Sequence, residues 1–195
     1  MKRIKFILSI ALLAAMSWVT AQEYKAAKEE SVLNWTGQKV TGKHFGTIGL
    51  TSGKFRIEEG EIVAAEFVVD MNTIENDDVE NEEYKEKLLN HLKSDDFFGV
   101  DKFPTATFRM TRPAEIEGGN AMVTGDLTIK GITHPIVFKA VVDQKEDKAR
   151  VFGNLVIDRT KYDVKYGSGK FFDNLADNTI YDEFTINLNL SAYPD

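Results

Sequence analysis

The sequence predicts an all-β protein: eight antiparallel strands that close into a β-barrel, with one inserted helix. Two observations carry the barrel prediction. Apolar and polar residues alternate with a period of two through eight segments, the pattern of strands with one buried face. The chain shows no alternation of strands with helices and no internal repeat. Eight antiparallel strands of this length can close on themselves, which removes exposed sheet edges.

The first 21 residues are predicted to be a secretory signal peptide. Lys2, Arg3 and Lys5 precede an apolar run at residues 6–19, and small residues precede a cleavage point after Ala21. The apolar run is too short for a membrane span, although an uncleaved anchor helix is the alternative. Cleavage near Ala21 predicts a periplasmic or secreted protein.

Charge and cysteine content limit the classes of partner and the kinds of chemistry that are expected. Residues 22–195 hold 21 basic and 31 acidic side chains, a net charge of −10. This balance argues against nucleic acid and against an anionic bilayer surface as default partners. The chain has no cysteine, so disulfides, thiol chemistry, cysteine-zinc sites and lipobox-type lipid attachment are excluded.

A polar, flexible lead-in is expected at residues 22–30, before a single domain at 31–195. The eight predicted strands cover residues 31–40, 47–57, 62–71, 104–111, the two arms of a hairpin at 121–142, 149–158 and 182–192. The hairpin is expected to turn at Gly131 and at His134-Pro135, which interrupt the alternation. In the third strand, one face is predicted to carry Val63, Ala65, Phe67, Val69 and Met71.

A helix is predicted over residues 82–93. Tyr84, Leu88 and Leu92 recur at i, i+4 and i+8, with Leu89 beside them. Acidic residues precede this segment and Lys93 lies in its last turn, which suits the helix dipole.

The inward faces of the strands could line an apolar tunnel or simply fill a core. Both need the same alternation, and eight strands lie at the border between the two cases. Each methylene removed from water contributes about 0.8 kcal/mol, so a long hydrocarbon chain needs no polar motif to bind. The candidate lining residues are Trp35, Phe55, Phe67, Val69, Phe108, Met110, Leu127, Ile129, Phe138, Phe184, Ile186 and Leu188.

Basic residues concentrate in the long connection before the last strand. Arg159, Lys161 and Lys170 are candidates to contact the polar head group of a lipid, with Lys165 nearby. The alternative is ordinary surface salt bridges with neighbouring aspartates. His44, His91 and His134 are far apart in sequence, so no metal site is predicted. The chain carries no recognised catalytic motif.

Six segments, taken in order, resemble the YceI-like family of secreted bacterial proteins. They are TGKHFG (41–46), FVVDMNTI (67–74), LLNHLKSDDFF (88–98), FPTATF (103–108), GDLTIKGITHPI (125–136) and DRTKYDV (158–164). The resemblance runs from about Ser31 to the C-terminus. It implies a lipocalin-like barrel with a helix beside it, and a long apolar tunnel for a polyisoprenoid or similar amphiphile. Gly99 departs from the family pattern, where an acidic residue is more usual.

The expected function is that of a binding or carrier protein, not an enzyme. Its expected ligand is a long-chain isoprenoid, a quinone or a fatty-acid-type lipid, with no cofactor, no nucleic acid and no membrane span. Two alternatives stay open: an enzyme that acts on a lipid in the cavity, and an eight-stranded membrane barrel, whose strands also alternate. The sequence also leaves open a homodimer and a lid role for the helix.

Overall fold

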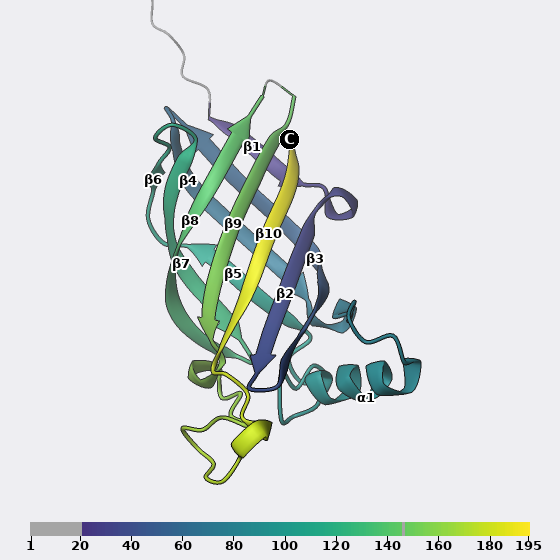
Figure 1. Ribbon diagram of the computed structural model, residues 1–195. Helices are drawn as coiled ribbons and strands as arrows, with labels where there is room; N and C mark the ends of the chain where they lie inside the picture. Colours follow the sequence, from purple (N-terminus) through teal and green to yellow (C-terminus); the bar gives the residue numbers. More distant parts are fainter. Residues whose placement is uncertain (1–20, 146) are drawn as a thin grey trace, which may run out of the picture.

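Eight long antiparallel strands form a closed barrel in the computed structural model, which describes residues 21–145 and 147–195 (Figure 1). Each strand pairs with the next along the chain, and the last pairs with the first, so the ring closes. The predicted fold class is therefore confirmed. The strands are β2 (Val32–Lys39), β3 (Gly42–Glu58), β4 (Glu61–Asp70), β5 (Thr105–Met110), β7 (Asn120–Ile129), β8 (Ile132–Gln144), β9 (Ala149–Asp158) and β10 (Glu183–Pro194).

Residues 1–20 of the predicted signal peptide lie outside the described residues. Within the described part of the chain, no helix is both long enough and apolar enough to cross a membrane.

The prediction of a flexible lead-in at residues 22–30 is wrong. Strand β1 (Gln22–Ala26) pairs with β3 and β10, and a 3-10 turn, η1 (Lys28–Glu30), joins it to β2. Tyr24 is 1% exposed and stacks on Phe55 with ring centroids 5.1 Å apart. Its hydroxyl accepts a hydrogen bond from Gln144 Nε2 at 2.7 Å. One buried aromatic residue and backbone pairing therefore hold a segment that is otherwise polar.

The predicted inner face of the third strand is wrong at Val63, because the strand contains a β-bulge. Ile57 pairs with Ile62 whereas Arg56 pairs with Ala64, so Val63 is the extra residue. The bulge places Ile62, 4% exposed, on the inner face instead of Val63. A two-residue strand, β6 (Ala114–Glu115), also pairs with β4 beside this bulge.

The hairpin turns at Lys130-Gly131, and not at His134-Pro135. Both turn residues have positive φ, 52° and 74°, as a tight two-residue hairpin requires. Pro135 lies inside β8 and pairs with Asp126. Among the described residues β8 pairs with β9 only from Ala140 onward, so the missing N–H of Pro135 costs no ladder bond there.

The two ends of the barrel differ. Short turns, Gln22 and the C-terminus lie at the upper end of Figure 1, and two long connections lie at the lower end. The first connection holds η2 (Met71–Thr73) and α1 (Glu82–Lys93), and the second holds η3 (Arg159–Tyr162) and η4 (Ala176–Asn178). Helix α1 has the predicted bounds.

The apolar face of α1 is shorter than predicted. Leu89 and Leu92 pack against the core, but Tyr84 is 65% exposed, with Lys87 Nζ 5.4 Å from its ring centroid. The helix has no fully buried residue and lies beside the barrel (Figure 1). It is therefore anchored mainly through its C-terminal half.

Residues 75–78 are held against the start of β3. Trp35 Nε1 donates to the Glu75 carbonyl at 2.9 Å, and the fully buried Asn76 donates through Nδ2 to the Phe45 carbonyl at 3.0 Å. Gly46 permits this approach, because a Cβ there would lie 2.0 Å from the Glu75 carbonyl oxygen. The connection that leads to α1 is thus pinned where β3 leaves the lower end.

Gly46→Ala is expected to destabilise the protein by about 2 kcal/mol or more, since the new methyl group meets backbone that cannot move aside cheaply. Chemical denaturation measures the change. Gly42→Ala is the matched control on the same strand, because a Cβ at Gly42 meets nothing within 4 Å. Equal stability of the two variants would contradict the close packing described here.

Candidate functional site

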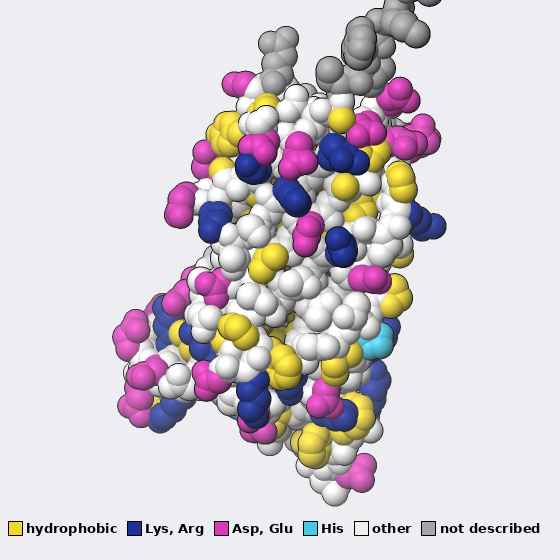
Figure 2. Space-filling view, turned by 180° about the vertical axis from the view of Figure 1, so that it is seen from behind, with side chains coloured by type: hydrophobic (Ala, Val, Ile, Leu, Met, Phe, Trp, Pro, Cys, Tyr) yellow, Lys and Arg dark blue, Asp and Glu magenta, His cyan; other side chains and the backbone are white. Residues whose placement is uncertain are grey.

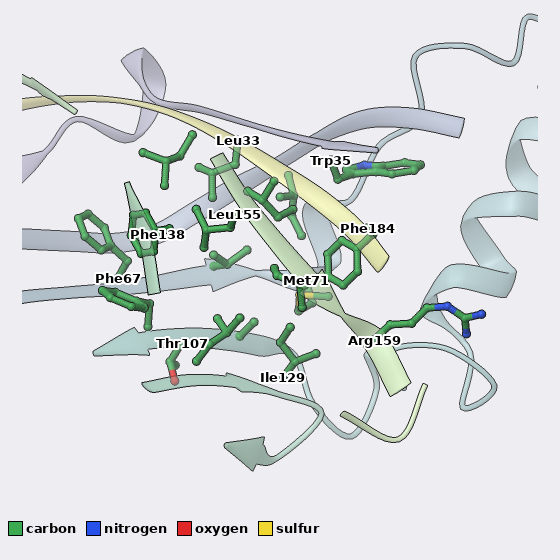
Figure 3. Close-up of a pocket in the computed structure, with 18 of the residues that line it drawn as sticks. Leu33, Trp35, Phe67, Met71, Thr107, Ile129, Phe138, Leu155, Arg159 and Phe184 are labelled. Carbon is green, nitrogen blue, oxygen red and sulfur yellow. The ribbon is translucent and has the colours of Figure 1, made fainter. Parts of the chain in front are cut away.

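The barrel encloses an apolar cavity of about 200 Å³. Inward-facing side chains from all eight long strands line it. Figure 3 shows Phe67 and Phe138 toward one end of this cavity, and Trp35, Phe184 and Arg159 toward the other. The side chains of the barrel therefore leave empty space within the ring.

Eleven of the twelve predicted lining residues border this cavity: Trp35, Phe55, Phe67, Val69, Phe108, Leu127, Ile129, Phe138, Phe184, Ile186 and Leu188. Met110 does not; it ends β5 and packs against the core elsewhere. Contact between these residues and a ligand stays a prediction.

The sequence analysis missed lining residues that come from outside the strands. Met71, Ile74, Leu92, Phe97 and Phe98 all belong to the connection between β4 and β5. Met71 was on the predicted apolar face of the third strand and Leu92 on that of the helix, but neither was assigned to the cavity. The Phe97-Phe98 pair lies in a loop, which has no periodicity from which to assign a face. These residues close one side of the cavity at the lower end of the barrel.

The cavity reaches the surface at this lower end, which we call the mouth. Its lining there includes the exposed residues Gln38, Tyr181 and Glu183. In contrast, the lining near the upper end consists of buried residues such as Ile62 and Leu190. Residues with polar side chains therefore lie where a ligand would enter, although the surface that lines the cavity is almost wholly apolar.

Arg159 lies at the mouth, but its guanidinium is already engaged. It is 3% exposed, and it donates through Nε to the Tyr181 carbonyl at 3.0 Å. The two terminal nitrogens donate to the Val164 carbonyl at 2.8 Å and the Ile180 carbonyl at 3.0 Å. Burial lowers the pKa of Arg159, while the nearby charges of Asp182 and Asp158 oppose that shift. In this arrangement the arginine holds the connection 159–182 in place.

The other head-group candidates lie outside the cavity lining. Lys170 Nζ forms ion pairs with Asp182 at 3.0 Å and Asp158 at 3.3 Å, as the salt-bridge alternative expected. Lys165 pairs with Asp163 at 2.6 Å. Lys161 is exposed, and its backbone carbonyl lies 3.0 Å from His134 Nε2.

An aromatic cluster joins the two long connections at the mouth. The His91 ring of α1 makes edge contacts with Phe97, at a centroid distance of 4.9 Å, and with Tyr166, at 4.5 Å. Phe98 meets Phe184 of β10 edge-on at 6.2 Å. Helix α1 and the connection 159–182 therefore form one packed unit around the opening. Within residues 21–145 and 147–195, no group of three or more His, Cys, Asp or Glu side chains could hold a metal ion.

Arg159→Gln is expected to lower the free energy of unfolding by about 2–4 kcal/mol, because it leaves buried carbonyl groups without donors. Thermal and chemical denaturation measure this loss. Lys161→Gln is the control: this neighbouring exposed side chain should change stability by no more than about 0.5 kcal/mol. A tolerated Arg159→Gln substitution would show that the guanidinium does not hold the mouth together.

The lowered pKa of Asp182 predicts that the structure around the mouth loses stability in acid. Burial raises its pKa, but the Ser168 hydroxyl and the charges of Lys170 and Arg159 outweigh burial and hold the pKa below its ordinary value. A carboxylate with a lowered pKa stabilises the fold above its unfolded-state pKa, and this contribution is lost as the pH falls below about 4. The melting temperature of Asp182→Asn should therefore be lower than wild type near neutral pH and should fall less on acidification. Asp177→Asn, at an exposed site, should keep the wild-type profile.

Comparison with known proteins agrees with this architecture. The model of the YceI-like domain matches residues 24–192, which begin within β1 and so before the boundary predicted at residue 31. A UPF0312 protein of Shewanella denitrificans is 36% identical over 88 residues, which cover 45% of this chain and 44% of that protein. A UPF0312 protein of Pseudomonas aeruginosa is 36% identical over 104 residues, covering 53% of this chain and 51% of that protein. The chain thus spans about half the length of the curated relatives it matches.

Solved structures share the fold at low sequence identity. BcnA of Burkholderia cenocepacia superimposes with a TM-score of 0.67 at 21% identity, covering 85% of this chain and 98% of that one. A polyisoprenoid binding domain from Saccharophagus degradans, described as implicated in plant cell wall breakdown, gives a TM-score of 0.64 at 18% identity, with 88% and 98% covered. The family match over residues 24–192 shows that this chain belongs to the YceI-like family.

Proposed function

We propose that this protein binds one long-chain isoprenoid, or a lipid with a comparable apolar chain, inside the barrel and carries it in the periplasm or outside the cell. The observation that carries the proposal is the apolar cavity with polar lining residues at its mouth. Such a site removes a hydrocarbon chain from water and leaves a polar head near solvent.

Family membership supports the same ligand class. The structural neighbour from Saccharophagus degradans is described as a polyisoprenoid binding domain. At 18% identity that likeness establishes the fold alone, so the ligand class is a proposal for this chain. The predicted signal peptide supports the proposed location, because a cleaved leader near Ala21 would release the barrel outside the cytoplasm.

The cavity volume limits how the ligand lies. The cavity of about 200 Å³ is smaller than the usual ligand pocket, which measures about 300–1,000 Å³. A long chain must therefore displace lining side chains or extend through the mouth. Partly buried lining residues such as Phe67, Phe184 and Leu188 are the ones with room to move.

The contacts of the basic residues at the mouth favour a binding role over a catalytic one. Arg159 directs its donors to backbone carbonyls, and Lys170 is held by two aspartates, so these cations stabilise the fold around the opening. An apolar chain would be retained by burial alone, without a reacting group beside it.

Mass spectrometry of lipid extracted from natively purified mature protein tests the proposal. An isoprenoid recovered in near-stoichiometric amount is expected, and a quinone or a fatty acid would redefine the ligand within the same cavity. The mature protein is also expected to purify without detergent, since the apolar faces of its strands point inward. Absence of any co-purified amphiphile, together with no uptake of prenyl probes, would refute the carrier proposal.

Leu155→Trp should reduce binding of a fluorescent farnesyl probe at least tenfold. Leu155 lines the cavity from β9, and the indole ring of a tryptophan there would fill the space that the ligand needs (Figure 3). Asn154→Trp is the matched control, because the adjacent residue is exposed on the outer face of the same strand. Denaturation should show that both variants remain folded. Undiminished probe binding by folded Leu155→Trp would place the ligand elsewhere.

A further inference from the structure

Exposed apolar side chains lie after β2 and in the connection 159–182, two segments that meet at the mouth of the cavity. We define the apolar rim as Val40, Tyr166, Phe171, Phe172 and Tyr181, which are 51%, 45%, 48%, 48% and 49% exposed. Figure 2 shows hydrophobic side chains next to Lys and Arg side chains at this lower end of the molecule. Several large apolar groups gathered at one opening are typical of an interaction surface, whereas single exposed apolar residues are ordinary.

Backbone contacts fix the rim to the mouth. Val40 N donates to the Thr179 carbonyl at 3.1 Å, and Tyr181 N donates to the Gln38 carbonyl at 2.9 Å. Tyr181 also lines the cavity, so the apolar rim reaches the mouth through this residue. Tyr166 is held by its edge contact with His91.

Phe171 and Phe172 lie in a turn that is held by hydrogen bonds to the buried Ser168. Both backbone N–H groups donate to the carbonyl of the fully buried Ser168, at 3.1 and 3.0 Å. The anchored turn keeps the two adjacent aromatic rings at the surface. Lys165 Nζ lies 5.3 Å from the Phe171 ring centroid, so a cation accompanies the aromatic pair.

The charge of the rim segment differs from that of the rest of the chain. Residues 159–182 carry four basic and four acidic side chains, so this segment has no net charge within a mature chain of 21 basic and 31 acidic residues. A zwitterionic lipid surface would therefore meet little net charge on the rim segment.

We propose that the apolar rim docks on a lipid bilayer, with Phe171 and Phe172 entering the interfacial region and the mouth facing the lipid. Aromatic side chains with nearby lysines are the composition favoured at membrane–water interfaces. The opening of an apolar cavity between them gives a hydrocarbon chain a path that avoids water. The inference rests on the proposed function in one respect, because it names the bilayer as the place where the ligand enters and leaves.

Flotation of the mature protein with vesicles of phosphatidylcholine and phosphatidylethanolamine tests the docking, without added isoprenoid. Wild type is expected to float with the vesicles, and Phe171→Ser/Phe172→Ser should lower the partition coefficient at least tenfold. Val137→Ser/Val141→Ser is the matched control, since these two valines are 54% and 43% exposed on the outer face of β8, away from the rim. The control should float as wild type does.

Docking and ligand binding can be told apart in the same set of proteins. Phe171 and Phe172 do not line the cavity, so their double variant should bind a fluorescent farnesyl probe in solution with wild-type affinity. Vesicle binding without probe binding would refute the proposed ligand and leave the docking intact. No flotation of wild type, or equal flotation of wild type and the Phe171/Phe172 variant, would overturn the docking proposal and assign the rim to a protein partner.

Discussion

Closure of an antiparallel sheet at eight strands is the constraint on which the structure depends. Ring closure satisfies most of the edge hydrogen bonds and fixes a narrow interior that side chains nearly fill. The cavity of about 200 Å³ is what remains after Phe67, Phe108 and Phe138 have taken their places inside. The ligand proposal therefore depends on side-chain volume within a fixed ring, and an added ring at Leu155 is a large change on that scale.

The lower end is built differently from the barrel wall. There a buried guanidinium replaces strand pairing, since Arg159 holds the carbonyls of Val164, Ile180 and Tyr181 together. A buried charge with several hydrogen bonds is costly to disturb, because removing it leaves polar groups unpaired. This local order also explains how a long connection can present exposed aromatic rings at a defined place.

Periodic segments could be predicted from the sequence because one apolar face decides their structure. Helix α1 and strand β9 have the predicted bounds, and eleven predicted lining residues border the cavity. The failures have local causes. One extra residue at Val63 moves the inner face to Ile62, and β1 depends on a single buried ring, Tyr24, that has no periodic neighbours.

Site residues in the connections were harder to predict. Phe97 and Phe98 border the cavity from a loop, where sequence spacing does not reveal which way a side chain faces. Arg159 was expected to contact a head group, but its surroundings are carbonyls brought close by the tertiary fold. Such partners lie up to 22 residues away and leave no motif.

Strands β8 and β9 pair over only part of their length, and we call the unpaired stretch of the barrel wall the seam. Below Ala140 and Gly153 the described residues of these two strands share no ladder, and η3 covers the gap through contacts of His134 with Tyr162 and with the Lys161 carbonyl. Elsewhere, spreading the wall would break interstrand hydrogen bonds. Along this seam the contacts of His134 with η3 take the place of a ladder, so a guest thicker than the empty bore would have fewer interstrand hydrogen bonds to break there.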